Sequence, residues 1–324
     1  MTNISQTCSE DYTFSQFILP GQTFAVAYGI NDLGAITGAG NVNGFILNQG
    51  TVTEVQVPFS YPVPLAINNP GQVAGFFPKS DGSHAFIDTN GTITYFASLP
   101  SSFVNDARAS GINDLGQVVG QYKGLTGTVP ETITAQFGFI DIGGTLTTLT
   151  LADGTGFLPT GINDFDQIVG TTTAGVSGVL DLKTDTFKTI DVPGAASTDA
   201  TAINNLGQVA GTYTDSSGVV HGFVDTYGHF TFLDPSASVP GTLEAISAIN
   251  DFGQVIGQVV SNYVTESFVG SPVKPGGLLA DLIPALPPDI EQALLHIGPS
   301  LPGGSAVNLN IGGVVPIPPR FDHI

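Results

Sequence analysis

Four ionisable residues stand at comparable places in three stretches of this 324-residue chain. Asp106 and Arg108 lie in the string NDARASGIN. Asp199 lies in STDATAIN and Glu244 in TLEAISAIN, again a few residues before an Ile-Asn pair. Paired carboxylates can exchange protons with a bound sugar, and an arginine beside them can orient a polar substrate. The simpler interpretation is an ion pair between Arg108 and one of the carboxylates.

Aromatic residues in the neighbouring loops could add a stacking surface for carbohydrate, although loop aromatics commonly pack locally. They are Phe59, Tyr61, Phe103, Tyr122 and Phe157, next to an enlarged loop at 123–136. The ligand-binding residues expected from both sets are Asp106, Arg108, Asp199, Glu244, Tyr61, Phe103 and Tyr122. If the protein is an enzyme, the expected catalytic residues are Asp106, Asp199 and Glu244.

Familiar catalytic and cofactor motifs are absent from the sequence. It contains no Gly-x-Ser-x-Gly, HExxH, Walker A or dinucleotide-binding string. Its single cysteine, Cys8, can form neither an intrachain disulfide nor a Cys-x-x-Cys metal site. We therefore expect no cofactor and no metal. Catalysis stays open, because a site assembled from separate segments leaves no local motif.

An internal repeat defines the elements that must position these residues. Six segments share the pattern Ile-Asn-[Asp/Asn]-x-Gly-Gln-[Val/Ile]-x-Gly, and their Ile residues are spaced by 37, 45, 50, 41 and 46 residues. The segments are GINDLGAITG (29–38), AINNPGQVAG (66–75), GINDLGQVVG (111–120), GINDFDQIVG (161–170), AINNLGQVAG (202–211) and AINDFGQVIG (248–257). Each period holds four short runs of β-branched and aromatic residues bounded by turn residues, which is typical of strands. Four strands per period of about 44 residues predict an all-β, six-bladed β-propeller over residues 12–271.

The ends of the repeat predict how the ring closes. The sixth unit has three strands and then reaches Pro272, where the composition changes. The segment YTFSQFILPG (12–21) matches the fourth strand of the fifth unit, FTFLDP (230–235). We expect residues 12–20 to complete the sixth blade and remove an exposed sheet edge. By analogy with other propellers, the strands that end in Ile-Asn should line a central channel.

The Asn-Asp turns allow two interpretations. Calcium prefers oxygen ligands, and aspartates stand at this position in four copies, Asp32, Asp114, Asp164 and Asp251. However, Asn69 and Asn205 replace the aspartate in the other two, so a neutral amide is sufficient. We expect the Asx side chain to accept a hydrogen bond from the backbone two residues on, with the following glycine at positive φ.

Two other repeated features have structural interpretations. A glycine ends the second strand of every unit, at positions 38, 75, 120, 170, 211 and 257, where a bulge or a close approach between strands requires no Cβ. His84 and His221 occupy equivalent positions in the second and fifth units, too far apart in a six-fold ring to share a metal. We expect both histidines to form local hydrogen bonds.

Residues 1–11 and 272–324 lie outside the repeat. The first segment has neither the basic start nor the apolar core of a signal peptide. The C-terminal extension, 272–324, is rich in Pro, Gly and Leu, with a short helix predicted to end near Ile297 and an edge strand predicted within 306–319. Pro and Asp interrupt it too often for a membrane span. It could fold back on the propeller or join a second copy in a homo-oligomer.

The charge balance limits the partners. The chain carries 27 acidic and 7 basic side chains, a net charge of −20. Nucleic-acid binding requires basic charge to displace counterions from phosphate. Nucleic acids and anionic membrane surfaces are therefore not expected as partners.

The repeated string is followed by His-Ala-Phe at 84–86 and by His-Gly-Phe at 221–223, and it resembles the HAF-repeat family of bacterial extracellular proteins. The likeness covers about residues 13–270. Ala35 replaces the glutamine of the pattern, Asp166 replaces its turn glycine, and the histidine occurs in two units of six. The resemblance implies a secreted or surface-exposed bacterial β-propeller, and it brings no settled activity, cofactor or catalytic residue.

These observations together predict an extracellular or cell-surface module without catalysis that binds or assembles. Its expected partner is a glycan or a cell-surface protein, bound through one face of the propeller. The first alternative is a glycan-processing hydrolase or lyase that uses the carboxylates named above. The second is a self-assembling structural subunit joined through 272–324.

Overall fold

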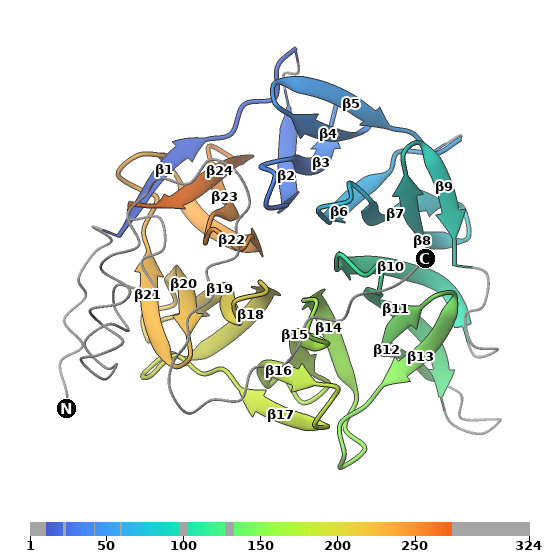
Figure 1. Ribbon diagram of the computed structural model, residues 1–324. Helices are drawn as coiled ribbons and strands as arrows, with labels where there is room; N and C mark the ends of the chain where they lie inside the picture. Colours follow the sequence, from blue (N-terminus) through green and yellow to red (C-terminus); the bar gives the residue numbers. More distant parts are fainter. Residues whose placement is uncertain are drawn as a thin grey trace, which may run out of the picture. The chain divides into compact units, whose positions relative to one another are not determined.

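The repeats fold into six four-stranded antiparallel sheets around a central axis, as Figure 1 shows. The computed structural model describes residues 11–21, 24–41, 43–58, 60–96, 103–126 and 133–273. Within this part of the chain the protein is an all-β, six-bladed β-propeller, which confirms the predicted fold class. The predicted helix and edge strand of the C-terminal extension, and Cys8, lie outside the described residues.

The first three complete blades are formed from consecutive strands. Blade one contains β2 (Ala25–Ile30), β3 (Ile36–Gly40), β4 (Gly44–Asn48) and β5 (Thr51–Val55). Blade two contains β6 (Val63–Ile67), β7 (Val73–Lys79), β8 (Gly82–Thr89) and β9 (Thr92–Tyr95). Blade three contains β10 (Phe103–Ile112), β11 (Val118–Thr126), β12 (Ile133–Ile142) and β13 (Thr145–Leu149).

The remaining blades follow the same order, except that the sixth takes its outer strand from the N-terminus. Blade four contains β14 (Phe157–Ile162), β15 (Gln167–Thr172), β16 (Ser177–Asp181) and β17 (Thr186–Thr189). Blade five contains β18 (Ser197–Ile203), β19 (Gln208–Thr214), β20 (Val220–Thr226) and β21 (His229–Leu233). Blade six contains β22 (Thr242–Ile249), β23 (Val255–Ser261), β24 (Val264–Pro272) and β1 (Tyr12–Gln16).

The ring closes through β1, as predicted. This strand pairs antiparallel with β24, from Tyr12 opposite Pro272 to Gln16 opposite Phe268. The buried Tyr12 hydroxyl donates a hydrogen bond of 2.8 Å to the carbonyl of Gly253, in the turn between the first two strands of blade six. The N-terminal strand is therefore tied to both the outer and the inner part of its blade.

The repeated glycine lies inside the second strand of every blade and not at its end as predicted, but close packing requires it, which confirms its predicted role. A Cβ at Gly120 would lie 2.1 Å from the carbonyl oxygen of Arg108, and one at Gly211 would lie 2.1 Å from that of Asp199. The inner strand shifts register at this point in every blade, so that one extra residue bulges from it. In five blades the same glycine faces a phenylalanine of the third strand, and these are Phe45, Phe86, Phe139, Phe223 and Phe268.

The apolar core is divided among the blades. Each of the six clusters of buried side chains lies within one blade and its contact with a neighbour. The third-strand phenylalanines are at most 2% exposed and belong to five of these clusters. In the described residues no helix is long and apolar enough to cross a membrane.

Candidate functional site

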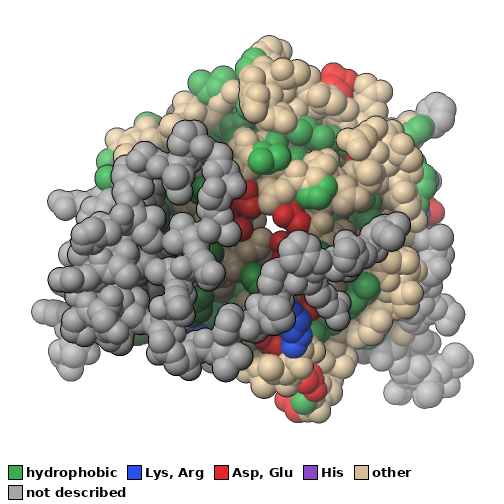
Figure 2. Space-filling view, in the orientation of Figure 1, with side chains coloured by type: hydrophobic (Ala, Val, Ile, Leu, Met, Phe, Trp, Pro, Cys, Tyr) green, Lys and Arg blue, Asp and Glu red, His purple; other side chains and the backbone are tan. Residues whose placement is uncertain are grey.

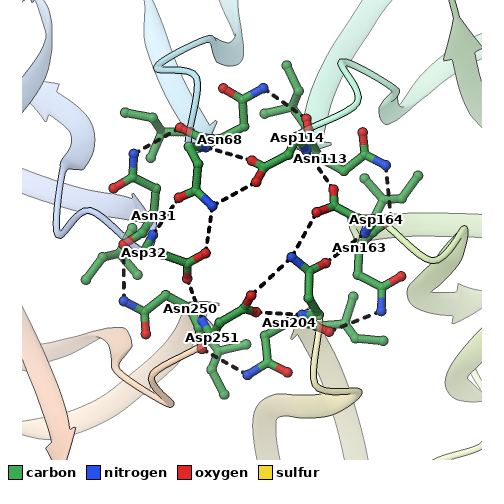
Figure 3. Close-up of a pocket in the computed structure, with 18 residues that line it drawn as sticks. Asn31, Asp32, Asn68, Asn113, Asp114, Asn163, Asp164, Asn204, Asn250 and Asp251 are labelled. Atoms are coloured by element: carbon green, nitrogen blue, oxygen red, sulfur yellow. Dashed lines mark hydrogen bonds between the residues drawn. The ribbon is translucent and has the colours of Figure 1, made fainter. Parts of the chain in front are cut away.

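The inner strands β2, β6, β10, β14, β18 and β22 line the central channel, as expected, and their Ile-Asn ends meet at one mouth. The asparagines of these pairs form what we call the Asn ring (Figure 3). Its members are Asn31, Asn68, Asn113, Asn163, Asn204 and Asn250, all 2–5% exposed. Each amide donates a hydrogen bond of 2.9–3.1 Å to the backbone carbonyl of the next asparagine, and the sixth donates to the first.

The remaining hydrogen-bonding capacity of the Asn ring is used within its own turns. Each Oδ1 accepts the backbone N–H four residues on, at 2.7–3.1 Å. In five blades the amide also donates to the glutamine of the repeat, as Asn68 does to Gln72 at 2.9 Å. The Asn and Gln of the motif therefore hold each turn and join it to the next blade.

A second ring lies next to the first and contains the residue that follows each asparagine. We call it the Asx ring; it consists of Asp32, Asn69, Asp114, Asp164, Asn205 and Asp251. Each Oδ1 accepts the backbone N–H of the ring member before it, at 2.7–2.9 Å, and the circle is closed. The predicted bond to the backbone two residues on is therefore wrong for this position. The blades converge so closely that this Oδ1 reaches the backbone of the neighbouring turn, whereas each Oδ1 of the Asn ring accepts from its own turn.

The two amides of the Asx ring separate its carboxylates. Asn69 donates to Asp32 at 2.6 Å and to Asp114 at 2.8 Å. Asn205 does the same for the second half of the ring, at 2.9 Å and 3.1 Å. Blades one to three thus repeat the Asp-Asn-Asp pattern of blades four to six.

Negative charge gathers where these two halves meet. The halves meet at Asp114–Asp164 and at Asp251–Asp32, where no amide side chain separates the neighbouring carboxylates. Burial, together with the charges of Asp32 and Asp164, raises the pKa of the Asp251 carboxyl. Figure 2 shows acidic side chains bordering the central opening. The two rings and the isoleucines before them line an open pocket of about 80 Å³. Among the described residues, no group of three or more His, Cys, Asp or Glu side chains is placed to hold a metal ion.

An exposed apolar side chain follows every member of the Asx ring. We call these six residues the crown; they are Leu33, Pro70, Leu115, Phe165, Leu206 and Phe252. The large members are 48–66% exposed, because they stand at the tips of the turns that the two rings fix. Tyr227, which is 63% exposed, extends the crown by donating a hydrogen bond of 2.7 Å to the carbonyl of Leu206. The crown was missed at the sequence level, although an apolar residue at a turn tip in every copy was a visible signal.

The predicted ion pair has a different cation. Lys123, and not Arg108, pairs with Asp106, at 2.5 Å. Burial alone would raise the pKa of the Asp106 carboxyl, but hydrogen bonds from Lys123 and Ser83 hold it below its usual value. The guanidinium of Arg108 instead lies over the ring of Phe76, 4.4 Å from its centroid. Lys123 reaches the carboxylate from the adjacent strand, whereas Arg108 extends over the neighbouring blade.

The other predicted acids contact different blades. Asp199 is exposed. Nevertheless, desolvation by neighbouring protein groups raises the pKa of its carboxyl, although a hydrogen bond from Thr171 of blade four acts to lower it. Glu244 is also exposed and accepts a hydrogen bond of 3.4 Å from Thr265 of its own blade. These residues lie toward the N-terminal ends of their inner strands, and the Asn ring follows the C-terminal ends. Neither cavity of the channel is lined by them.

Two of the three predicted aromatic side chains that the structure describes are interior. Tyr122 is 3% exposed, stacks on Phe137 and shares a hydrogen bond of 3.0 Å with Thr148, because strand alternation directs it into blade three. Phe157 is likewise fully buried. Tyr61 is 66% exposed and remains available for contacts. The Phe103 side chain, Phe59 and residues 127–132 lie outside what the structure describes. The predicted loop 123–136 is too long, because residues 123–126 belong to β11 and residues 133–136 to β12.

The two histidines form local contacts, as predicted. His84 lies 2.9 Å from Asp81 and stacks on Phe77. His221 lies 3.2 Å from an aspartate of its own blade and stacks on Tyr213 in the same way. Both histidines therefore belong to the structure of their blades.

No protein-family model and no curated protein matches this sequence. Among solved structures, the chain is similar to the putative TolB from Agrobacterium tumefaciens, with 12% identity and a TM-score of 0.48 over 82% of this chain and 99% of that one. It is also similar to TolB from Acinetobacter baumannii (11%, 0.46, over 78% of this chain) and spans 64% of that chain. A third similar structure is the Aleuria aurantia lectin in complex with α-methyl-L-fucoside (11%, 0.41, over 78% and 95%). These likenesses concern the fold and say nothing about function.

Proposed function

We propose that the protein is a binding module without catalysis, and that a partner protein docks on the ring face, the face formed by the Asn ring, the Asx ring and the crown. The observation that carries the proposal is the crown itself. Apolar side chains scattered singly on a surface need no explanation, but six of them around one channel mouth favour an interaction site. Aromatic residues, phenylalanine included, are enriched in the cores of protein interfaces, and Phe165 and Phe252 are 55% and 62% exposed.

The same geometry favours a protein over a glycan on this face. Sugar recognition requires both side-chain donors and acceptors beside the aromatic rings, but the amides of the ring face already donate within the rings, which leaves only carboxylate acceptors. Leucine and proline make up most of the crown and offer neither stacking faces nor hydrogen bonds. The apolar contacts of a protein segment match these residues better.

A glycan remains the second candidate for the opposite face. The exposed Tyr61, Arg108 and Glu244 favour it there, because one offers a ring and the others offer charged hydrogen-bonding groups. The hydrolase or lyase alternative would require Asp106, Asp199 and Glu244 to meet at one bound sugar. Extracellular location, and assembly through 272–324, remain predictions from the resemblance and from the composition of the extension.

The test is selection of binders from a displayed library of random peptides on the full-length protein. We expect selected peptides to lose at least about tenfold in affinity when Phe165 and Phe252 are both replaced by serine. The matched control is Tyr263→Ser, since Tyr263 is a fully exposed aromatic at the opposite end of blade six. Peptides that respond to Tyr263→Ser and ignore the crown would contradict the proposal.

A glycan array tests the second candidate. Binding that is lost in Tyr61→Ala and kept in the crown variant would place the ligand on the opposite face. Turnover of a bound glycan that disappears in Glu244→Gln would support the enzyme alternative and contradict a module without catalysis.

A further inference from the structure

We infer that the segment docked on the crown is basic as well as apolar, and that it places a lysine or arginine side chain at the mouth of the channel inside the crown. This inference rests on the proposed function, and it adds the chemistry of the partner. The crown supplies the docking surface, and the charge at its centre determines which apolar segments fit.

The first argument is charge complementarity. The crown surrounds four carboxylates and two amides. In the described part of the chain, no ion pair involves a member of the Asx ring. Lys183 lies near the crown, but it pairs with Asp166 at 3.3 Å, and neither belongs to the ring. A cationic side chain from a partner would therefore meet uncompensated negative charge, whereas an acidic segment would be repelled.

The second argument is the acceptor capacity of the carboxylates. An ionised carboxylate has about four lone-pair sites. Asp114 uses one oxygen for the backbone of Asn69 and the other for its amide. Acceptor sites remain for the donors of an ammonium or guanidinium group. The elevated pKa of Asp251, caused by burial and by neighbouring carboxylates, supports the same conclusion, because a nearby cation would relieve that repulsion.

The third argument is size and surroundings. The space at the ring, about 80 Å³, is wide enough to admit the charged end of a lysine or arginine side chain. The aliphatic stem of lysine or arginine would lie along the crown while its charged head reaches the carboxylates. Apolar residues around a charged contact exclude water from it and so strengthen it.

The crown is uneven, and this unevenness predicts where the apolar part of the segment binds. Blades four to six contribute Phe165, Leu206 and Phe252, with Tyr227 beside them. The equivalent positions of blades one to three hold only leucine and proline. We expect the aromatic half to anchor the segment and the aliphatic half to contribute less.

The experiment uses the peptides selected on the full-length protein. We expect enrichment of lysine or arginine between apolar residues, and an affinity at least about tenfold lower when that residue is replaced by norleucine, which removes charge and keeps the stem. Raising the ionic strength from about 0.05 M to about 0.5 M should weaken the basic peptides and leave the norleucine peptides nearly unchanged. The variant Asp32→Asn/Asp164→Asn should lower the affinity of the basic peptides and leave that of the norleucine peptides unchanged. The salt and norleucine measurements use the unchanged protein, so they do not depend on the stability of this variant.

The outcomes separate the two proposals. Peptides that depend on Phe165 and Phe252 but show no basic enrichment and no salt dependence would overturn this inference and leave the proposed function intact. Peptides that ignore the crown would overturn both. Replacing Leu33 and Leu115 by serine should lower the affinity less than replacing Phe165 and Phe252 by serine. The reverse order would contradict the expectation that the aromatic half of the crown anchors the segment.

Other occupants of the crown are distinguished by photocrosslinking. Benzoylphenylalanine at position 252 replaces one aromatic side chain by another in the full-length chain. We expect it to crosslink the basic peptide, and to do so less efficiently with the norleucine peptide. A crosslink within one chain to residues 274–324, or between two copies of the chain, obtained in preference to the peptide would overturn the inference.

Discussion

At the scale of single residues, the two asparagines of the Asx ring differ from its four aspartates in what they can donate. An aspartate at this position accepts a backbone N–H and can offer no proton at neutral pH. The Asn69 and Asn205 amides do offer protons, and each joins two carboxylates that would otherwise face each other. Asparagine at these two positions therefore reduces the repulsion between the carboxylates of the ring, which aspartate there would increase.

The variant Asn205→Asp tests this requirement. It removes both donated hydrogen bonds and adds a fifth carboxylate, so we expect a loss of about 2–4 kcal/mol in the free energy of unfolding at pH 7. The deficit should shrink on acidification, because a protonated carboxyl can donate again. Urea denaturation at several pH values measures it. Asn262→Asp, in the exposed β23–β24 turn, is the control, and an equal effect of the two changes would refute the bridging role.

The pKa values of Asp251 and Asp106, at opposite ends of the channel, should be shifted in opposite directions. The pKa of Asp251 is raised from its ordinary value of 3.8, mainly by burial and then by Asp32. A raised pKa means that the folded state binds the proton more tightly, so its stabilising effect is present at low pH and is lost as the pH rises above 3.8. The pKa of Asp106 is lowered by Lys123 against the effect of burial, so its contribution is lost as the pH falls.

Carbon-detected NMR titration of the side-chain carboxyls measures both groups. The substitution Lys123→Met should raise the pKa of Asp106 and leave that of Asp251 unchanged. A titration of Asp251 at or below its ordinary value would show that the ring carboxylates do not repel one another.

At the scale of the strand, the bulge of each inner strand and the glycine opposite it form one unit. The glycine lets the inner strand approach the second strand, and the register shift there turns the following residues toward the channel. In blades three to five the bulged residue is a serine or threonine whose hydroxyl donates to a carbonyl of the next inner strand, as Ser110 does to Pro159 at 2.9 Å. The bulge therefore also joins neighbouring blades.

The substitution Gly211→Ala should be strongly destabilising. Its Cβ would lie 2.1 Å from the Asp199 carbonyl oxygen, so the inner strand would have to move, at a cost of at least about 3 kcal/mol. Gly161→Ala is the matched control, because its nearest neighbour lies at 3.2 Å and alanine occupies the same place in other copies, for example Ala202. Thermal melting should separate the two variants clearly, and similar melting temperatures would refute the close-approach argument.

The sequence alone predicted what depends on local pattern. Strand number, blade order, closure by an N-terminal strand and the role of the second-strand glycines follow from periodicity and from the steric limits of glycine. The closing strand was predicted over residues 12–20 and is Tyr12–Gln16. The rings could not be predicted in this way, because Asp32 and Asp251 are 219 residues apart and meet only after closure. Tyr122 was predicted to lie beside a loop, but β11 continues to Thr126, and the alternation of side chains along this strand directs Tyr122 into the blade. The Arg108 pair failed because Lys123 lies on the adjacent strand.

At the scale of the whole propeller, both rings of hydrogen bonds depend on closure. Asn250 donates to the carbonyl of Asn31, and the backbone N–H of Asp251 donates to Asp32, so the first and sixth blades must be in contact. Closure in turn depends on β1, whose Tyr12 and Phe14 pack in the core of blade six. The binding face and the N-terminal strand are therefore coupled, although they are far apart in the sequence.

Removal of residues 1–16 should therefore destabilise the whole propeller as well as exposing the edge of blade six. We expect the melting temperature to fall by more than about 10 °C and β24, left as an unpaired edge, to promote association that increases with concentration. Removal of residues 1–10 alone is the control, because it keeps β1 whole. Differential scanning calorimetry and light scattering measure the two effects. If the two truncated proteins have the same melting temperature, β1 contributes only a surface strand and the blades themselves hold the rings. A clearly lower melting temperature for the longer truncation, with loss of peptide binding to the crown in that protein alone, would show that the N-terminal strand maintains the ring face.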